Sequence, residues 1–191
     1  MDGELIPLSQ NLMWYAGMKQ GNTGNYAQDR PSGAYVFRPS NDASPVATTA
    51  TLTNVIKGQI VQEVHQQFND WCSQVVRIYK GRAEIEIEWT VGPIPVDADG
   101  IGKEIINRVT TKLASNGLFY TDSNGRQTVE RRRNYRSTWT MNVTEPIASN
   151  YYPINSHIYI TNGSAFVALV TDRSQGGTSL YDGQIELMVT Y

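Results

Sequence analysis

The sequence predicts a mostly β, antiparallel β-sandwich fold, and three observations support this. Threonine, valine and isoleucine are plentiful alongside 11 tyrosines and 4 tryptophans. Turn-forming glycine, asparagine, aspartate and proline recur at short spacing, and Ala83 to Val91 alternates strictly between apolar and polar residues. This composition is typical of a sandwich or barrel and not of a helical bundle. A chain of 191 residues is long enough for one domain with a hydrophobic core.

The amino-terminal segment predicts no regular element. Residues 1–31 contain Gly17, Gly21, Gly24 and several amides, which favour loop conformations. We therefore expect a loop or connector over residues 1–31 and a β-sandwich domain over residues 32–191. A second connector is expected over Pro39 to Thr51, which is rich in proline and small polar residues.

The segment from Val61 to Tyr79 allows two interpretations. Its apolar residues, among them Val64, Phe68 and Val75, fall at helical spacing, which permits an amphipathic helix. The same residues also fit two paired strands. The residue pattern alone leaves both possibilities open.

The clearest strand is Ala83 to Val91, because its apolar residues alternate with Glu84, Glu86 and Glu88. The strand is expected to end at Gly92-Pro93. A loop rich in aspartate and glycine follows, and then an apolar-rich run from Glu104 to Leu113. This order predicts a meander.

Two hairpins are predicted in the carboxy-terminal half. The first surrounds Asp122 to Gly125, and the second joins His157–Thr161 to Ala165–Thr171. The second contains Asn162-Gly163, the pair that type I′ turns favour. The later glycines Gly176-Gly177 are interpreted as loop residues that adopt positive φ.

Charge and composition exclude several classes of partner. A net charge of −2 and a pI near 5.7 argue against nucleic acid and anionic membrane. No apolar run reaches the ~20 residues that a membrane helix requires, and the first residues do not resemble a signal peptide. The single cysteine, Cys72, is expected to pack as a small hydrophobe. Asn142 and Asn162 begin N-glycosylation sequons, which fit a secretory route.

No complete active site is visible in the residues. Glu84, Glu86 and Glu88 are spaced by about 7 Å along one strand face, which suits a salt-bridged surface better than two carboxylates flanking a sugar. The candidate metal ligands His65, His157, Asp97, Asp99 and Asp122 show no ligand spacing. The arginines between Arg131 and Arg136 are expected to pair with acidic residues of a neighbouring domain.

Several ordered motifs resemble one known family. They are "SGAYVFRP" from Ser32, "NDWCSQVVRIYKG" from Asn69, "EIEWTVGPIPV" from Glu86, "FYTDSNGR" from Phe119, and "LVTDRSQGGTSLYDGQIELMV" from Leu169. Together they closely resemble the carboxy-terminal half of glycoside hydrolase family 38, the lysosomal type of α-mannosidase. The resemblance covers nearly all of the chain from Ser32.

This resemblance implies a β-sandwich chain, part of a galactose-mutarotase-like supersandwich, in a retaining zinc-dependent α-mannosidase that hydrolyses terminal α-mannosides. It implies that zinc and the catalytic carboxylates belong to a partner catalytic domain, with no catalytic residue and no cofactor in this chain. Tyr35 of "SGAY" resembles the tyrosine that offers its hydroxyl to the sugar, although a core tyrosine fits the pattern too. By the same resemblance, Val61 to Tyr79 is expected to form two paired strands.

The implied partners are the other chains or domains of the same α-mannosidase and mannose-terminated glycans, with a possible homo-oligomer of the assembled enzyme. The implied location is the lysosome or the secretory route. The rival hypothesis is a self-standing glycan-binding or assembly module derived from that sandwich. Its contact surface would include the tyrosine-rich segment Asn150 to Pro153.

Overall fold

The computed structural model describes residues 6–19, 30–33 and 35–190. The chain divides into two compact units, one made of Met1–Ala43 and Gly102–Tyr191, the other of Ser44–Ile101. The described residues form β-strands and a 3₁₀ turn, and every strand pairing given for them is antiparallel. The predicted mostly β, antiparallel fold is therefore confirmed. Within the same residues, no helix is long and apolar enough to cross a membrane.

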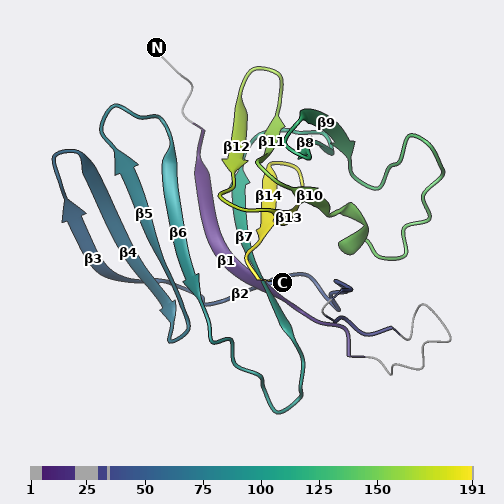
Figure 1. The fold of residues 1–191 in the computed structure, drawn as a ribbon, viewed down its shortest axis with the longest axis horizontal. Helices are drawn as coiled ribbons and strands as arrows, with labels where there is room; N and C mark the ends of the chain where they lie inside the picture. Colours follow the sequence, from purple (N-terminus) through teal and green to yellow (C-terminus); the bar gives the residue numbers. More distant parts are fainter. Residues whose placement is uncertain (1–5, 20–29, 34, 191) are drawn as a thin grey trace. The chain divides into compact units, whose positions relative to one another are not determined.

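The first unit is a sandwich of two sheets (Figure 1). Within this unit, the strands of the larger sheet lie in the order β10-β13-β14-β7-β1, and those of the smaller sheet lie in the order β12-β11-β8-β9. The strands of the larger sheet are β1 (Leu8–Ala16), β7 (Lys103–Thr111), β10 (Tyr152–Ile154), β13 (Gln175–Thr178) and β14 (Gln184–Met188). Those of the smaller sheet are β8 (Leu118–Ser123), β9 (Gln127–Arg132), β11 (His157–Thr161) and β12 (Phe166–Val170), and the 3₁₀ turn η2 spans Ala148–Asn150.

The larger sheet is buried on both faces, and each face has its own core. One face packs on the smaller sheet, where Ile185 and Leu187 of β14 meet Phe119 and Ile158. On the other face Tyr15, Ile106 and Met188 are covered by side chains from non-strand segments, namely Phe37, Ala43, Ile147, Tyr151 and Leu180. Alternation along a strand sends successive side chains to opposite faces, so β14 supplies both cores.

The prediction of a loop over residues 1–31 is wrong for Leu8–Ala16, which form β1. This strand pairs along its whole length with β7, from Leu8 opposite Thr111 to Ala16 opposite Lys103. Leu12 and Tyr15 are almost fully buried. The glycines that suggested a loop begin at Gly17, just beyond the strand. The expected 32–191 domain is also divided, because Ser44–Ile101 form a unit of their own.

The second unit holds a four-stranded antiparallel sheet in the order β3-β4-β5-β6. The strands of this sheet are β3 (Thr51–Lys57), β4 (Val61–Asn69), β5 (Cys72–Tyr79) and β6 (Ile85–Val91). The two-residue strand β2 (Ser44–Pro45) belongs to the same unit but not to this sheet. The paired-strand interpretation of Val61 to Tyr79 is confirmed, with Val64 opposite Val76. Helical spacing arose because the hairpin turn at Asp70-Trp71 falls inside the run. There the Asn69 side chain accepts a hydrogen bond from the Trp71 N–H at 3.0 Å.

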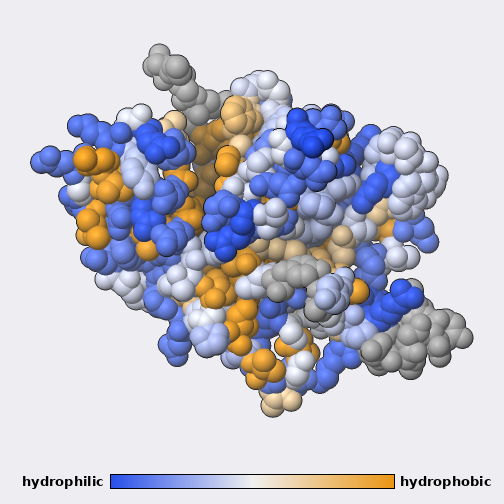
Figure 2. Space-filling view, in the orientation of Figure 1, coloured by the Kyte–Doolittle hydropathy of each residue, from blue (hydrophilic) through white to orange (hydrophobic). Residues whose placement is uncertain are grey.

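The predicted salt-bridged face of β6 is confirmed. Arg77 on β5 lies 3.0 Å from Glu63, 2.9 Å from Glu86 and 2.6 Å from Glu88, and Glu84 pairs with Arg82. These carboxylates are paired with arginines, and ion pairs near the surface contribute little to stability. Several apolar side chains of this unit are nevertheless exposed, among them Leu52, Val55 and Ile60, and orange residues are scattered among blue ones in the space-filling view (Figure 2).

Both predicted hairpins form, but the turn of the second differs from expectation. At Asn124 and Gly125 φ is 53° and 67°, and Ser123 accepts a hydrogen bond from the Arg126 N–H, as a type I′ turn requires. The prediction of a type I′ turn at Asn162-Gly163 is wrong, because only Gly163 has positive φ. There the Asn162 side chain accepts hydrogen bonds from the Ser164 and Ala165 N–H groups instead.

The prediction of positive φ at Gly176 and Gly177 is also wrong, because both lie in strand β13. Close packing explains them. A Cβ added at Gly176 would lie 2.8 Å from the sulfur of Met188, and one at Gly177 would lie 2.6 Å from Ile154. Both glycines therefore allow neighbouring side chains to approach the backbone.

Asp122 ties the end of β8 to the start of β11. Its carboxylate accepts hydrogen bonds from the N–H groups of Gly125 at 2.8 Å, Asn155 at 2.8 Å, Ser156 at 2.9 Å and His157 at 3.3 Å. Burial alone would raise the pKa of Asp122, but these backbone donors hold that pKa well below its usual range. The ionised carboxylate therefore stabilises the first unit.

We expect Asp122→Asn to reduce the free energy of unfolding by about 2 kcal/mol at pH 7, because charge-assisted hydrogen bonds are lost. A folded-state pKa below the unfolded value of about 3.9 gives stability that is present above that pH and is lost as the pH falls further. The difference between the variant and the parent chain should thus shrink below about pH 4. Urea denaturation at several pH values measures this.

The matched control is Asp172→Asn, because Asp172 is an exposed aspartate. It forms a 2.8 Å ion pair with Arg173, the next residue in the chain. Its effect should stay within about 0.5 kcal/mol. An Asp122→Asn defect that is absent at pH 7, or that grows on acidification, would contradict this role.

Candidate functional site

The segment around Tyr35 forms a tight turn. Gly33 and Val36 exchange two backbone hydrogen bonds, of 2.9 and 3.0 Å. We call Gly33, Tyr35 and Val36 the Tyr35 turn. The Tyr35 side chain is 94% exposed, so the alternative of a core tyrosine is wrong. A phenol held at the tip of a hydrogen-bonded turn is available for contact.

Ser32 and Arg38 secure the base of the Tyr35 turn. The Ser32 hydroxyl donates to the Val36 carbonyl at 3.1 Å and accepts from the Arg38 N–H at 3.2 Å. The Arg38 guanidinium donates to Glu145 at 2.8 Å and to the Arg30 carbonyl at 2.5 Å. Through Arg38 the turn is thereby attached to two other segments of the chain, at Arg30 and at Glu145.

Phe37 inserts between two tyrosine rings below the turn. Its ring lies edge to face with Tyr15 at a centroid distance of 5.7 Å and with Tyr151 at 5.0 Å. Such edge-to-face pairs stabilise beyond the area they bury. Phe37 therefore connects the Tyr35 turn to the buried core on this face of the larger sheet.

Both tyrosines are themselves held by one carboxylate, that of Glu186 on β14, which has no exposed surface. The Tyr15 hydroxyl donates to Oε2 of Glu186 at 2.8 Å, and the Tyr151 hydroxyl donates to the same atom at 2.9 Å. Arg108, directly opposite on β7, donates to Oε1 from Nε at 2.7 Å and lies 2.5 Å away through Nη2. We call Tyr15, Arg108, Tyr151 and Glu186 the Glu186 network.

Electrostatics fixes the protonation states in the Glu186 network. Burial, and then the charge of Glu186, raise the pKa of Tyr15 and of Tyr151 far above the ordinary value. Burial acts to lower the pKa of Arg108, but Glu186 outweighs it and the pKa is raised. Both phenols thus remain protonated hydrogen-bond donors, and Arg108 remains cationic.

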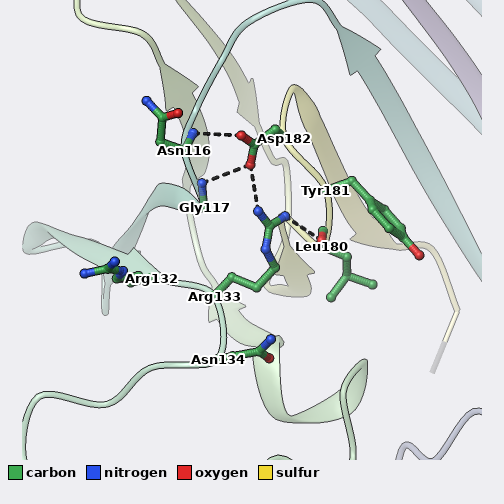
Figure 3. A pocket seen from close by; sticks show the side chains of 8 residues that line it. All are labelled: Asn116, Gly117, Arg132, Arg133, Asn134, Leu180, Tyr181 and Asp182. Carbon is green, nitrogen blue, oxygen red and sulfur yellow. Dashed lines mark hydrogen bonds and ion pairs between the residues drawn. The ribbon is translucent and has the colours of Figure 1, made fainter.

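A second polar feature of the first unit is an open hollow of about 550 Å³ (Figure 3). At its centre Asp182 and Arg133 point toward one another, with 2.6 Å between Oδ1 and Nη2. Asp182 also accepts from the N–H groups of Asn116 and Gly117 at 3.0 and 2.9 Å. These central charges satisfy one another, so we assign them a structural role in joining β9 to the segment before β14.

The arginine cluster makes contacts within the first unit, and its predicted pairing with acidic residues of a neighbouring domain stays a prediction. Arg133 pairs with Asp182. The guanidinium groups of Arg131 and Arg136 lie 4.3 and 5.0 Å from the ring centroid of Tyr152, a cation–π arrangement.

Each of the two histidines has a hydrogen-bond partner within its own unit. His65 in the second unit lies 2.9 Å from Glu63, and His157 in the first unit lies 2.9 Å from Thr128. Within residues 6–19, 30–33 and 35–190, no group of three or more histidine, cysteine, aspartate or glutamate side chains is arranged to hold a metal ion. The residues described here do not fit a zinc site.

The remaining candidates from the sequence are surface asparagines and a buried thiol. Asn142 and Asn162 are exposed, Asn162 at the tip of the β11–β12 hairpin, and their glycosylation stays a prediction. Cys72 is buried, and burial raises the pKa of its thiol to about 11. The residue thus has the properties of a small hydrophobe.

Sequence reasoning did not identify the Glu186 network. The available signal was a glutamate inside the apolar run Ile185 to Met188, since a charge in a buried strand requires a partner. Nothing local indicated Tyr15 or Arg108 as that partner, because they lie 171 and 78 positions away from Glu186 along the chain.

We expect Glu186→Gln to reduce the free energy of unfolding of the 191-residue chain by about 3–5 kcal/mol, because the partly buried Arg108 would lose its counter-ion. Thermal and urea denaturation measure this. The control is Glu130→Gln, because the exposed Glu130 also accepts from a tyrosine, Tyr120, at 3.1 Å. Equal effects of the two substitutions would contradict the assignment.

The chain is similar to proteins of one known family. The family model for the Glycosyl hydrolases family 38 C-terminal domain matches residues 3–190. Lysosomal alpha-mannosidases of Bos taurus and Homo sapiens are 55% and 53% identical over 97% of this chain, and an alpha-mannosidase of Canavalia ensiformis is 45% identical over 96%. The chain spans 18% of the length of each. It therefore belongs to the family of C-terminal domains of glycoside hydrolase family 38.

Proposed function

We propose that this chain is the non-catalytic β-sandwich portion of a retaining, zinc-dependent α-mannosidase that removes terminal α-mannosides from glycans. In this role it packs on a catalytic domain and presents the Tyr35 turn as part of the wall of the mannose pocket. The observation that carries the proposal is the placement of Tyr35, whose phenol is exposed on a turn closed by two backbone hydrogen bonds. A tyrosine hydroxyl suits a sugar because its ring is apolar and its tip is polar.

The chemistry of bond cleavage is assigned to another part of the enzyme. Glycoside hydrolysis with retention needs two carboxylates about 5–5.5 Å apart on either side of the scissile bond. Several carboxylates of this chain are instead paired with arginines or with backbone donors, among them Glu186, Glu86 and Asp122. We propose that zinc and both catalytic carboxylates belong to the partner catalytic domain.

We further propose a lysosomal or secretory location, with glycans on Asn142 and Asn162. Two observations support this: the relatives from Bos taurus and Homo sapiens are lysosomal alpha-mannosidases, and both asparagines are exposed. The partners proposed are the other domains of the same α-mannosidase, mannose-terminated glycans and, in the assembled enzyme, further copies of it.

The direct test is native purification from the source cells. Every chain in the fraction that contains this polypeptide is identified by mass spectrometry, and the fraction is assayed for zinc and for hydrolysis of a chromogenic α-mannoside. We expect α-mannosidase activity together with zinc and catalytic-domain sequence, and no activity from the 191-residue chain alone. A single inactive 21 kDa species would contradict the proposal and favour a self-standing binding module.

Substitution of Tyr35 tests its role. We expect Tyr35→Phe in the assembled enzyme to raise KM for an α-mannoside by roughly 3- to 10-fold, the effect of one lost hydrogen bond. The control is Tyr135→Phe, because Tyr135 is another exposed tyrosine, 50% accessible and beside Arg132. An unchanged KM for Tyr35→Phe would overturn the assignment of this hydroxyl to the sugar.

A further inference from the structure

We propose that Phe37 is a positioning residue for Tyr35, with the Glu186 network as its fixed support. This inference rests on the proposed function of Tyr35. It adds a residue that does not touch the sugar and acts through its hold on the Tyr35 turn.

The support is rigid because one carboxylate oxygen fixes two rings. Oε2 of Glu186 accepts the hydroxyls of Tyr15 and Tyr151 at 2.8 and 2.9 Å. These tyrosines come from β1 and from the residue after η2, two segments that are far apart in the sequence. A buried network whose members are all satisfied holds its side chains in a single arrangement.

Phe37 meets both rings of this support. Its centroid lies 5.7 Å from that of Tyr15 and 5.0 Å from that of Tyr151, at interplanar angles of 70° and 72°. Both contacts are edge to face, the arrangement that aromatic quadrupoles favour. The position of the Phe37 ring is therefore determined by Glu186 through the two tyrosines.

Phe37 is also coupled to Tyr35 through a short backbone path. Only Val36 separates them, and Val36 is locked to Gly33 by two backbone hydrogen bonds. Because the Tyr35 side chain is 94% exposed, contacts of its own ring contribute little to its placement. The backbone of the Tyr35 turn places the hydroxyl, and Phe37 is the apolar anchor of that backbone.

The remaining attachments of the Tyr35 turn are polar. They include the Ser32 hydroxyl, the partly exposed ion pair of Arg38 with Glu145, the Arg38 bond to the Arg30 carbonyl, and backbone hydrogen bonds of Ser32 and Arg38 with Met18. Water competes with such contacts, and they hold geometry less firmly than a packed ring does. Loss of the Phe37 ring should therefore move or loosen Tyr35 while the sandwich stays folded.

The experiment is a double-mutant cycle in the full-length enzyme that contains this chain. Phe37→Leu is combined with Tyr35→Phe, and KM, kcat and the melting temperature are measured with a chromogenic α-mannoside. The matched control is Phe119→Leu, because Phe119 is a buried phenylalanine with an edge-to-face contact to Tyr152 at 5.7 Å. Phe119→Leu removes the same atoms as Phe37→Leu, but from the core between the two sheets of the first unit.

We expect Phe37→Leu to raise KM by roughly 3- to 10-fold, with a smaller change in kcat. In the Tyr35→Phe background it should raise KM no further, because the hydroxyl that it positions is already absent. Phe119→Leu should lower the melting temperature but leave KM unchanged in both backgrounds.

The alternative outcomes are distinguishable. If Tyr35→Phe raises KM but Phe37→Leu does not, or if the two effects multiply, the inference is overturned and the proposed function stands. If Tyr35→Phe itself leaves KM unchanged, the proposed role of Tyr35 fails and the inference fails with it. Should Phe37→Leu not be recovered folded, Phe37→Met keeps more side-chain volume and is judged by the same criteria.

Discussion

The buried carboxylate of Glu186 is the constraint on which the first unit depends. A charge without exposed surface is stable only when it is paired and hydrogen-bonded. Arg108 supplies the opposite charge from the neighbouring strand, and two phenols supply further donors. These partners come from β7, from β1 and from the segment after η2, so the carboxylate brings together three distant parts of the chain.

This arrangement gives the two faces of the larger sheet different tasks. One face is an ordinary sandwich core, in which Ile185 and Leu187 pack on the smaller sheet. On the opposite face, non-strand segments cover the Glu186 network, and Phe37 lies there between the rings of Tyr15 and Tyr151. A stable core on one side thus supports an exposed turn on the other, and exposed turns on a firm scaffold are frequent positions for binding residues.

Local patterns predicted the elements that depend on local interactions. The alternation in Ala83 to Val91 and the turn residues Asn124 and Gly125 gave a strand and a hairpin that the structure confirms. Predictions were wrong where the conformation depends on distant contacts. Leu8–Ala16 forms a strand by pairing with β7, and Gly177 is a glycine because a Cβ there would collide with Ile154. At the candidate site, Tyr35 was identified by resemblance, whereas Phe37 and Glu186 act through partners that no local pattern reveals.

The most direct measurement is a crystal structure of the assembled enzyme with a bound, slowly hydrolysed α-mannoside. The account predicts the Tyr35 hydroxyl within about 3 Å of a sugar oxygen, with Phe37 still between Tyr15 and Tyr151 and both phenols on Glu186. A sugar bound far from Tyr35, or a Tyr35 turn that faces solvent in the assembled enzyme, would contradict the account.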